Sequence, residues 1–243
     1  SLVFVADRPE SGRWRYRLLE TVRQYAYEKF LAGSEAPDVL SRYIQYYREL
    51  AERTEPEINT ADRQPRLAAL ELEHGNLREA IERARVAGSH CEAARLAGAL
   101  FWFWFHRGHW REGRTLLGAA IAGETAPTPV RARALLGDGV LAWAEGDHTT
   151  AGARLEESAA IGRTLDDRCT TAHALHFLAM VRLAEGNASA GRPLAEEAVR
   201  VARQTPDAFC LTLALASYGV SVKPRTENIG SDRVPVSAVA VSS

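Results

Sequence analysis

Lysine is almost missing from this sequence. Only Lys29 and Lys223 occur among its 30 basic residues, so the other 28 are arginine. A phosphate-binding P-loop carries a lysine after Gly-x-x-x-x-Gly, and that lysine reaches the β- and γ-phosphates. Lys29 stands in Ala-Tyr-Glu-Lys-Phe and Lys223 in Ser-Val-Lys-Pro-Arg. Neither can be that lysine, so the sequence excludes a P-loop nucleotide site within it.

Cysteine and methionine are scarce as well. Cys91, Cys169 and Cys210 are single, far apart and odd in number, whereas a disulfide scaffold is denser and a zinc site usually shows Cys-x-x-Cys or Cys/His pairs. We therefore expect three buried, reduced thiols, a cytoplasmic location and no metal site. The only methionine is Met180, and the lack of an initiator methionine indicates a piece of a larger protein.

The sequence also lacks an excess of charge of either sign and a long apolar run. Its 243 residues carry 30 basic and 31 acidic side chains, a net charge of −1. Bulk charge therefore gives no reason to expect nucleic acid or an anionic membrane as a partner. We find no run of 18 apolar residues and no signal peptide. The length is enough for one or two domains.

The first 17 residues predict a β-hairpin. Residues 1–6 are rich in strand formers, residues 7–12 contain the proline and glycine of a turn, and residues 13–17 alternate charged and aromatic side chains. One interpretation is the wing of a winged helix that touches DNA phosphates. The other is a structural wing that docks one domain on another. The candidate wing residues are Arg8, Arg13, Arg15 and Arg17.

Almost everything after the hairpin follows a helical pattern. Apolar residues recur at spacings of three and four up to Gly33, and a second helix runs from Ser34 to about Glu55, where Pro56 ends it. Further helical segments reach about Val220, separated by short turns. Those turns are Gly75-Asn76, Gly108-His109, Gly146-Asp147 and Gly186-Asn187, at separations of 33, 38 and 40 residues. A period in this range indicates a helical solenoid.

Small residues recur at fixed distances from these turns. Five residues after each turn glycine stand Ala80, Gly113, Ala151 and Gly191, and twelve after it stand Ala87, Ala120, Ser158 and Ala198. Antiparallel helices approach closely only where side chains are small. The pattern resembles the tetratricopeptide repeat, although Asp138 stands where leucine is usual. We predict a mostly α fold, a tetratricopeptide-like helical-hairpin solenoid preceded by a β-hairpin; a generic helical bundle is the alternative.

These patterns divide the chain into four parts. We expect the C-terminal part of a winged-helix domain in residues 1–33 and a helical linker in residues 34–62. Tetratricopeptide-like repeats follow in residues 63–220, and residues 221–243 form a disordered tail.

No catalytic constellation is present in the sequence. A Gly-x-Ser-x-Gly elbow, a His-Glu-x-x-His motif and a dinucleotide-binding Gly-x-Gly-x-x-Gly are all missing. His106 and His109 flank a turn, and His173 and His176 are three apart on a helix. A zinc site needs three or four ligands, and no cluster of cysteine or histidine completes one. We therefore predict neither catalytic, cofactor-binding nor metal-binding residues.

Five consecutive aromatic residues, Phe101 to Phe105, form the most unusual segment. On a helix they face all directions, so we expect this helix to be buried nearly all round. In tetratricopeptide arrays the first helix of each hairpin lines a concave groove, and arginine and aromatic side chains there anchor partners. The candidate groove residues are Arg95, Trp102, Phe105, His106, Arg133, Leu136, Val140, Trp143, His173, His176, Met180 and Leu183.

Three segments resemble one family in the same order along the chain. They are residues 15–26 (RYRLLETVRQYA), residues 70–80 (LELEHGNLREA) and residues 103–114 (FWFHRGHWREGR). They are similar to large bacterial regulators of the LuxR and antibiotic-regulatory (SARP) types, built on a signal-transduction ATPase with an NB-ARC-like core. In that family the first segment ends a winged helix that follows the nucleotide-binding module.

The resemblance implies a sensor and protein-interaction module of an ATPase-type transcriptional regulator. ATP and Mg²⁺ would bind outside these residues, so this chain is not expected to be an enzyme or to hold a cofactor. Its repeats would bind a protein partner or an intramolecular segment, with a small-molecule effector as a further candidate. DNA would be bound only by domains outside the chain, and no membrane is expected. The alternatives are a DNA-contacting winged-helix fragment and a free-standing tetratricopeptide scaffold.

Overall fold

The computed structural model describes residues 3–7 and 15–222, and they fall into two compact units that divide between Gln45 and Tyr46. In the first unit, strands β1 (Val3–Asp7) and β2 (Arg15–Leu18) pair antiparallel, with Val3 opposite Leu18 and an irregularity between Val5 and Asp7. Helix α1 (Glu20–Leu31) follows. A two-stranded pair is thus present where the alternating pattern placed it, whereas its interpretation as a wing stays a prediction.

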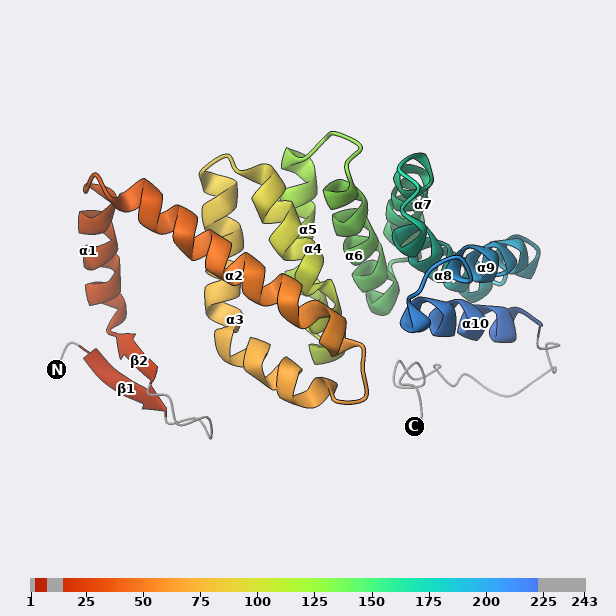
Figure 1. The fold of residues 1–243 in the computed structure, drawn as a ribbon, viewed down its shortest axis with the longest axis horizontal. Coiled ribbons are helices and arrows are strands. Elements are labelled where there is room, and N and C mark those ends of the chain that lie inside the picture. Colours follow the sequence, from red (N-terminus) through yellow and green to blue (C-terminus); the bar gives the residue numbers. More distant parts are fainter. Residues whose placement is uncertain (1–2, 8–14, 223–243) are drawn as a thin grey trace. The chain divides into compact units, whose positions relative to one another are not determined.

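The second unit is a succession of long helices (Figure 1). Helix α2 (Ala36–Ile58) begins in the first unit and ends in the second. Pro56 lies inside α2 and does not end it, so the predicted boundary at that residue is wrong. The remaining helices are α3 (Arg63–Val86), α4 (His90–Arg107), α5 (Trp110–Gly123), α6 (Pro129–Glu145), α7 (His148–Thr164), α8 (Arg168–Ala184), α9 (Ala188–Ala202) and α10 (Ala208–Val222).

Three of the four predicted glycine turns are confirmed. Gly108, Gly146 and Gly186 have φ angles of 77°, 82° and 78° and join α4 to α5, α6 to α7 and α8 to α9. Only glycine adopts this left-handed conformation at little cost, which explains its recurrence. The fourth prediction is wrong, because Gly75 lies inside α3. The break before α4 is instead at Gly88, with a φ angle of 74°.

The small residues predicted after each turn lie where helices approach closely. A Cβ added at Gly113 would lie 2.6 Å from Leu141 Cδ1 and 2.8 Å from the Trp104 ring. A Cβ at Gly191 would lie 2.9 Å from Leu183 Cγ. Ser158 is fully buried and its hydroxyl donates a hydrogen bond to the Ala132 carbonyl over 2.8 Å. These positions therefore set the spacing between neighbouring helices.

The aromatic helix α4 forms the centre of the core. Phe101, Phe103 and Trp104 are at most 1% exposed, Trp102 is 2% exposed and Phe105 is 7% exposed. The expectation of burial all round this helix is confirmed. The expectation of three buried thiols is wrong for Cys91, which is exposed in the first turn of α4, while Cys169 is half-buried and Cys210 buried.

Arginines on this scaffold join one helix to the next by ion pairs. Arg131 of α6 donates to Glu157 of α7 over 2.6 Å, and Arg182 of α8 donates to Glu156 of α7 over the same distance. Arg163 of α7 reaches Glu197 of α9 over 3.0 Å. The abundance of arginine therefore supplies pairs between helices that lie largely at the surface.

None of the helices that the structure describes is both long and apolar enough to span a membrane. The tail predicted for residues 221–243 begins in the last two residues of α10, Ser221 and Val222, and the rest of it lies outside the described residues.

Candidate functional site

The twelve candidate groove residues lie on α4, α6 and α8, the first helices of the three hairpins. Six of them are buried and so are withdrawn from the surface: Trp102, Phe105, Leu136, Val140, His173 and His176. The other six are half-buried and keep part of their surface exposed: Arg95, His106, Arg133, Trp143, Met180 and Leu183. The predicted groove is thus filled in part by its own side chains.

Aromatic rings from four helices fill the predicted groove. We call Trp102, Phe105, Trp143, Phe177 and Phe209 the inner aromatic cluster. The centre of the Trp102 ring on α4 lies 5.3 Å from the ring centre of Phe209 on α10 and 6.1 Å from that of Phe177 on α8. The ring centres of Trp143 on α6 and Phe177 are 5.3 Å apart. Such ring separations are those of favourable aromatic pairs. Phe177 and Phe209 were not among the predicted groove residues, although Phe177 directly follows His176, which was.

Burial changes the acid–base behaviour of two histidines beside this cluster. His106 stacks on Trp102 with 6.1 Å between ring centres, and burial, together with the charge of Arg63, lowers its pKa to about 4. His176 lies against Phe177, and burial lowers its pKa to about 3. Both imidazoles are therefore neutral at pH 7.

An open pocket of about 370 Å³, which we call the inner pocket, lies between the ends of α2, α4, α6 and α8. Its lining residues are Glu52, Glu55, Arg95, Ala99, Pro129, Val130, Arg133, Asp167, Cys169 and Thr170. Arg95 donates to Glu52 over 2.7 Å, and Arg133 forms an ion pair with Glu55. Two predicted groove arginines therefore face an open space, each already paired with a carboxylate of α2.

Arg133 is the more constrained of these two arginines. Its guanidinium carbon lies 4.9 Å from the centre of the Phe101 ring, a cation–π contact. Burial lowers the pKa of Arg133, and the nearby Cys169, Asp167 and Asp207 oppose that shift. Burial disfavours the charged form of Arg133. A negatively charged group brought into the inner pocket would therefore stabilise that charged form.

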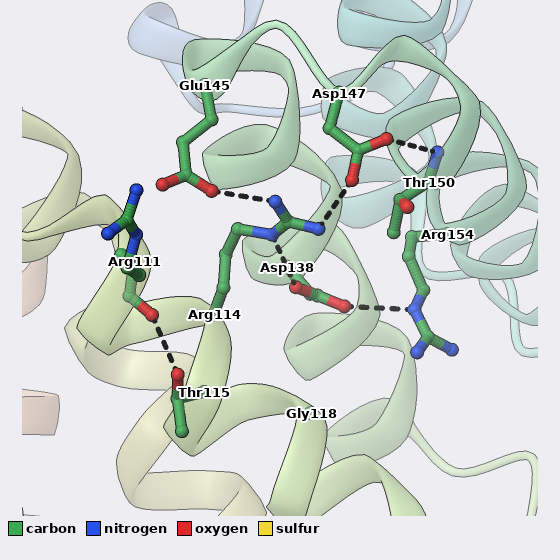
Figure 2. Close-up of a pocket in the computed structure, with 9 residues that line it drawn as sticks. All are labelled: Arg111, Arg114, Thr115, Gly118, Asp138, Glu145, Asp147, Thr150 and Arg154. Carbon is green, nitrogen blue, oxygen red and sulfur yellow. Dashed lines mark hydrogen bonds and ion pairs between the residues drawn. The ribbon is translucent and has the colours of Figure 1, made fainter.

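A second pocket, of about 660 Å³, lies over α5, α6 and the start of α7 (Figure 2). Arg114 extends between three carboxylates: it donates to Glu145 over 2.7 Å and to Asp147 over 2.8 Å, and lies 3.6 Å from Asp138. Arg154 donates to the other oxygen of Asp138 over 2.9 Å. The pocket is therefore polar, with charges that largely satisfy one another.

Asp138 is the central residue of that network. Its side chain is 5% exposed, and burial raises its pKa against the opposing effects of Arg154 and Arg114. Asp147 shows the opposite behaviour, since its hydrogen bonds with Thr150 lower its pKa. Asp138 replaces the leucine usual in such repeats, and it joins α5, α6 and α7 by charge. The guanidinium of Arg111 makes no ion pair with the described residues.

Two clusters of metal-ligating side chains occur in the described part of the chain, although the sequence predicted none. One contains Cys169, His173 and Cys210, and the other contains Glu71, His74 and His109. In the second cluster the two imidazoles stack with 4.5 Å between ring centres. Arg107 Nε also lies 3.4 Å from Glu71 Oε2, so that carboxylate already forms an ion pair with a guanidinium.

The candidate wing residues are only partly within the described structure. Arg8 and Arg13 lie outside the described residues, and the backbones of Arg15 and Arg17 lie on β2. The prediction that the chain has no catalytic residues remains a prediction.

Comparison with known proteins gives two relationships, and no known protein-family profile matches the chain. The chain is 36% identical over 221 residues to proteins named "Putative HTH-type transcriptional regulator" from Mycobacterium bovis and from two strains of Mycobacterium tuberculosis. The match covers 86% of this chain and 24% of each relative, so the chain spans about a quarter of their length.

Among solved structures, the chain is similar to that of a Podosopora anserina "putative kinesin light chain" with nearly identical TPR-like repeats. The TM-score is 0.50 at 18% identity, and the match covers 75% of this chain and 85% of the other. At this identity the likeness concerns the fold alone. The tetratricopeptide-like fold of the helical array is thereby confirmed, and the chain has homologues among the HTH-type transcriptional regulators.

Proposed function

We propose that this chain is the regulatory protein-interaction module of a larger HTH-type transcriptional regulator. The observation that carries the proposal is the 36% identity to such regulators over 86% of the chain, on a tetratricopeptide-like fold. Stacked helical hairpins present extended surfaces to protein partners. The described residues show pockets lined by paired charges, which suit recognition of a partner more than chemistry on a substrate.

We propose further that the whole regulator is of the signal-transduction ATPase type, with an NB-ARC-like core, and acts in the cytoplasm. The resemblance of residues 15–26 to the end of the family's winged helix supports this. ATP and Mg²⁺ would bind to the ATPase module and not to this chain, because neither of its two lysines follows a P-loop pattern. A nucleotide-binding assay on residues 1–243 should therefore detect no ATP binding.

We call the side of the array lined by α4, α6 and α8 its inner face. We propose that the partner contacts the half-buried residues of this face. Arg95 is the most informative of these, since it lines the inner pocket and its side chain is 39% exposed, and Met180 is a second half-buried residue of the predicted groove. An acidic group of a partner would compete with Glu52 for Arg95. Because the pair is partly exposed, exchanging one carboxylate for another costs little. The inner pocket could thus open to a partner without unfolding of α4.

The test measures transcription from a reporter gene by the complete regulator. Replacement of Arg95 and Met180 together by alanine should change the response to the activating signal, while circular dichroism shows an intact fold. The matched control replaces Arg163 and Arg182, which join helices away from the inner pocket. An unchanged response in the Arg95/Met180 variant, or the same change in both variants, would refute an interaction through the inner face.

A DNA-contacting wing is the competing function, and salt dependence distinguishes the two. A DNA binder that neutralises several phosphates loses affinity steeply as salt rises. We expect residues 1–243 to bind duplex DNA weakly or not at all even at low salt. Salt-dependent binding that disappears when Arg15 and Arg17 are replaced by alanine would overturn the interaction-module proposal.

A further inference from the structure

Two helices of the array bring four metal-ligating side chains to one place. Cys169 and His173 are one turn apart on α8. Asp207 directly precedes α10, and Cys210 lies in the first turn of that helix. The pattern is Cys-x-x-x-His followed, about one repeat later, by Asp-x-x-Cys. Because α10 packs against α8, the beginnings of the two helices meet.

The two distances measured from Cys169 Sγ are close to those between ligands of a tetrahedral zinc ion. Cys169 Sγ lies 3.8 Å from His173 Nδ1 and 3.5 Å from Asp207 Oδ2. The ligand atoms of Cys169, His173 and Cys210 all lie within 4.8 Å of one another. Zn–S bonds of about 2.3 Å and Zn–N or Zn–O bonds of about 2.1 Å place neighbouring ligand atoms about 3.4–3.8 Å apart in a tetrahedral site. Asp207 lies outside that group of three, so its carboxylate would have to rotate toward His173 and Cys210 to complete the coordination.

Asp207 is oriented for this role by its own helix. Its Oδ1 accepts hydrogen bonds from the backbone N–H groups of Phe209 and Cys210, over 2.9 and 3.2 Å. This capping leaves Oδ2 as the oxygen that faces Cys169. The carboxylate is therefore fixed before a metal arrives, which reduces the entropy cost of coordination.

The surroundings are closed on one side and open on the other. His173 is 3% exposed, Cys210 is 1% exposed, and Cys210 belongs to the apolar core shared by α8, α9 and α10. Cys169 also lines the inner pocket, which gives an ion a path from solvent. Zn²⁺ with two thiolates, one carboxylate and a neutral imidazole carries a net charge of −1. Arg133, which already pairs with Glu55, lines the same pocket.

We propose that Cys169, His173, Asp207 and Cys210 form a structural zinc site that fastens α10 to α8. Each thiol releases its proton to solvent as its sulfur coordinates the metal, so no oxidant or reductant is needed. Four protein ligands leave no open position for substrate, so the role is structural. The site would hold Phe209 against Trp102 and so keep the inner aromatic cluster closed.

The test titrates the reduced, metal-free chain with Co²⁺ and then displaces it with Zn²⁺. We expect one ion per chain and the absorption of a tetrahedral cobalt site with thiolate-to-metal charge transfer. Cys210→Ser should weaken cobalt binding by more than about 100-fold, beyond the loss typical of an outer-shell change. Cys91→Ser is the matched control, because Cys91 is exposed on α4, and it should leave binding unchanged.

A second variant guards against a folding defect in the first. Asp207→Asn keeps an oxygen to cap α10 but removes the charged ligand, and it should weaken cobalt binding by more than about 100-fold, beyond an outer-shell change, with unchanged helicity. Absence of the tetrahedral spectrum in the wild-type chain would overturn the proposal. So would equal cobalt affinity in the wild-type and Asp207→Asn chains. A Cys169–Cys210 disulfide in protein purified without reductant, with no bound zinc, would likewise overturn it.

Discussion

Two glycine substitutions with opposite expected effects on the free energy of unfolding can test whether a glycine sets the spacing between α4 and α6. Gly137 of α6 faces α4, and a Cβ built on it would lie 2.7 Å from Phe101 Cβ and 3.0 Å from Phe101 Cγ. Phe101 Cβ is attached directly to the α4 backbone, so it cannot rotate away. Gly137→Ala must therefore push the two helices apart.

The magnitude follows from two opposing effects. Alanine in place of glycine favours a helix by about 0.5–1 kcal/mol. Overpacking a closely packed interface costs about 1–3 kcal/mol. We therefore expect Gly137→Ala to lower the free energy of unfolding by about 1 kcal/mol, within a range of about 0–2.5 kcal/mol. For a chain of this length that lowers the melting temperature by roughly 2–4 °C per kcal/mol.

Gly75 supplies the matched control. It is exposed inside α3, and a Cβ built on it meets nothing within 4 Å. Gly75→Ala should raise the free energy of unfolding by about 0.5–1 kcal/mol, the full helix preference. Urea unfolding followed by far-ultraviolet circular dichroism measures both variants. Equal stabilisation by both substitutions would refute the argument that Gly137 sets the α4–α6 spacing. Destabilisation by Gly75→Ala would instead favour a turn at that residue.

Two further predictions concern buried polar groups. His106 and His176 have pKa values of about 4 and 3 in the folded chain against about 6.5 unfolded, so the unfolded state binds their protons first as the pH falls. Stability should fall by about 2 kcal/mol per histidine from pH 7 to pH 5, and urea unfolding of His106→Gln should show a smaller loss than wild type. Asp138→Ala should destabilise the chain by about 1–3 kcal/mol at pH 7, because Arg114 and Arg154 lose a buried partner, whereas Asp138→Asn should cost less in the same assay.

Local sequence was sufficient for features that depend on neighbouring residues. Gly108, Gly146 and Gly186 could be predicted because a left-handed turn nearly requires glycine. The burial of Phe101 to Phe105 followed from helical geometry alone. Gly75 could not be distinguished from a turn glycine in this way, since a helix tolerates an exposed glycine for about 1 kcal/mol and nothing local marks the difference.

Features that depend on the packing of helices far apart in the chain could not be predicted from the sequence. The groove residue Trp102 is buried because Phe209, far along the chain, packs on it. No periodicity reveals that contact. Likewise, Cys169 and Cys210 look isolated in the sequence, and only the packing of α10 on α8 brings their sulfurs together.

The ion pairs that link helices of the array have a consequence for chemical modification. They are made by arginine, whose guanidinium keeps its charge far above neutral pH and is not a substrate for lysine acetylation or ubiquitin attachment. Between Phe30 and Val222 the chain contains no lysine. Among side chains, cellular enzymes that act on lysine and amine-reactive labels in the laboratory therefore have only Lys29 and Lys223 as targets, and neither residue belongs to the helical array.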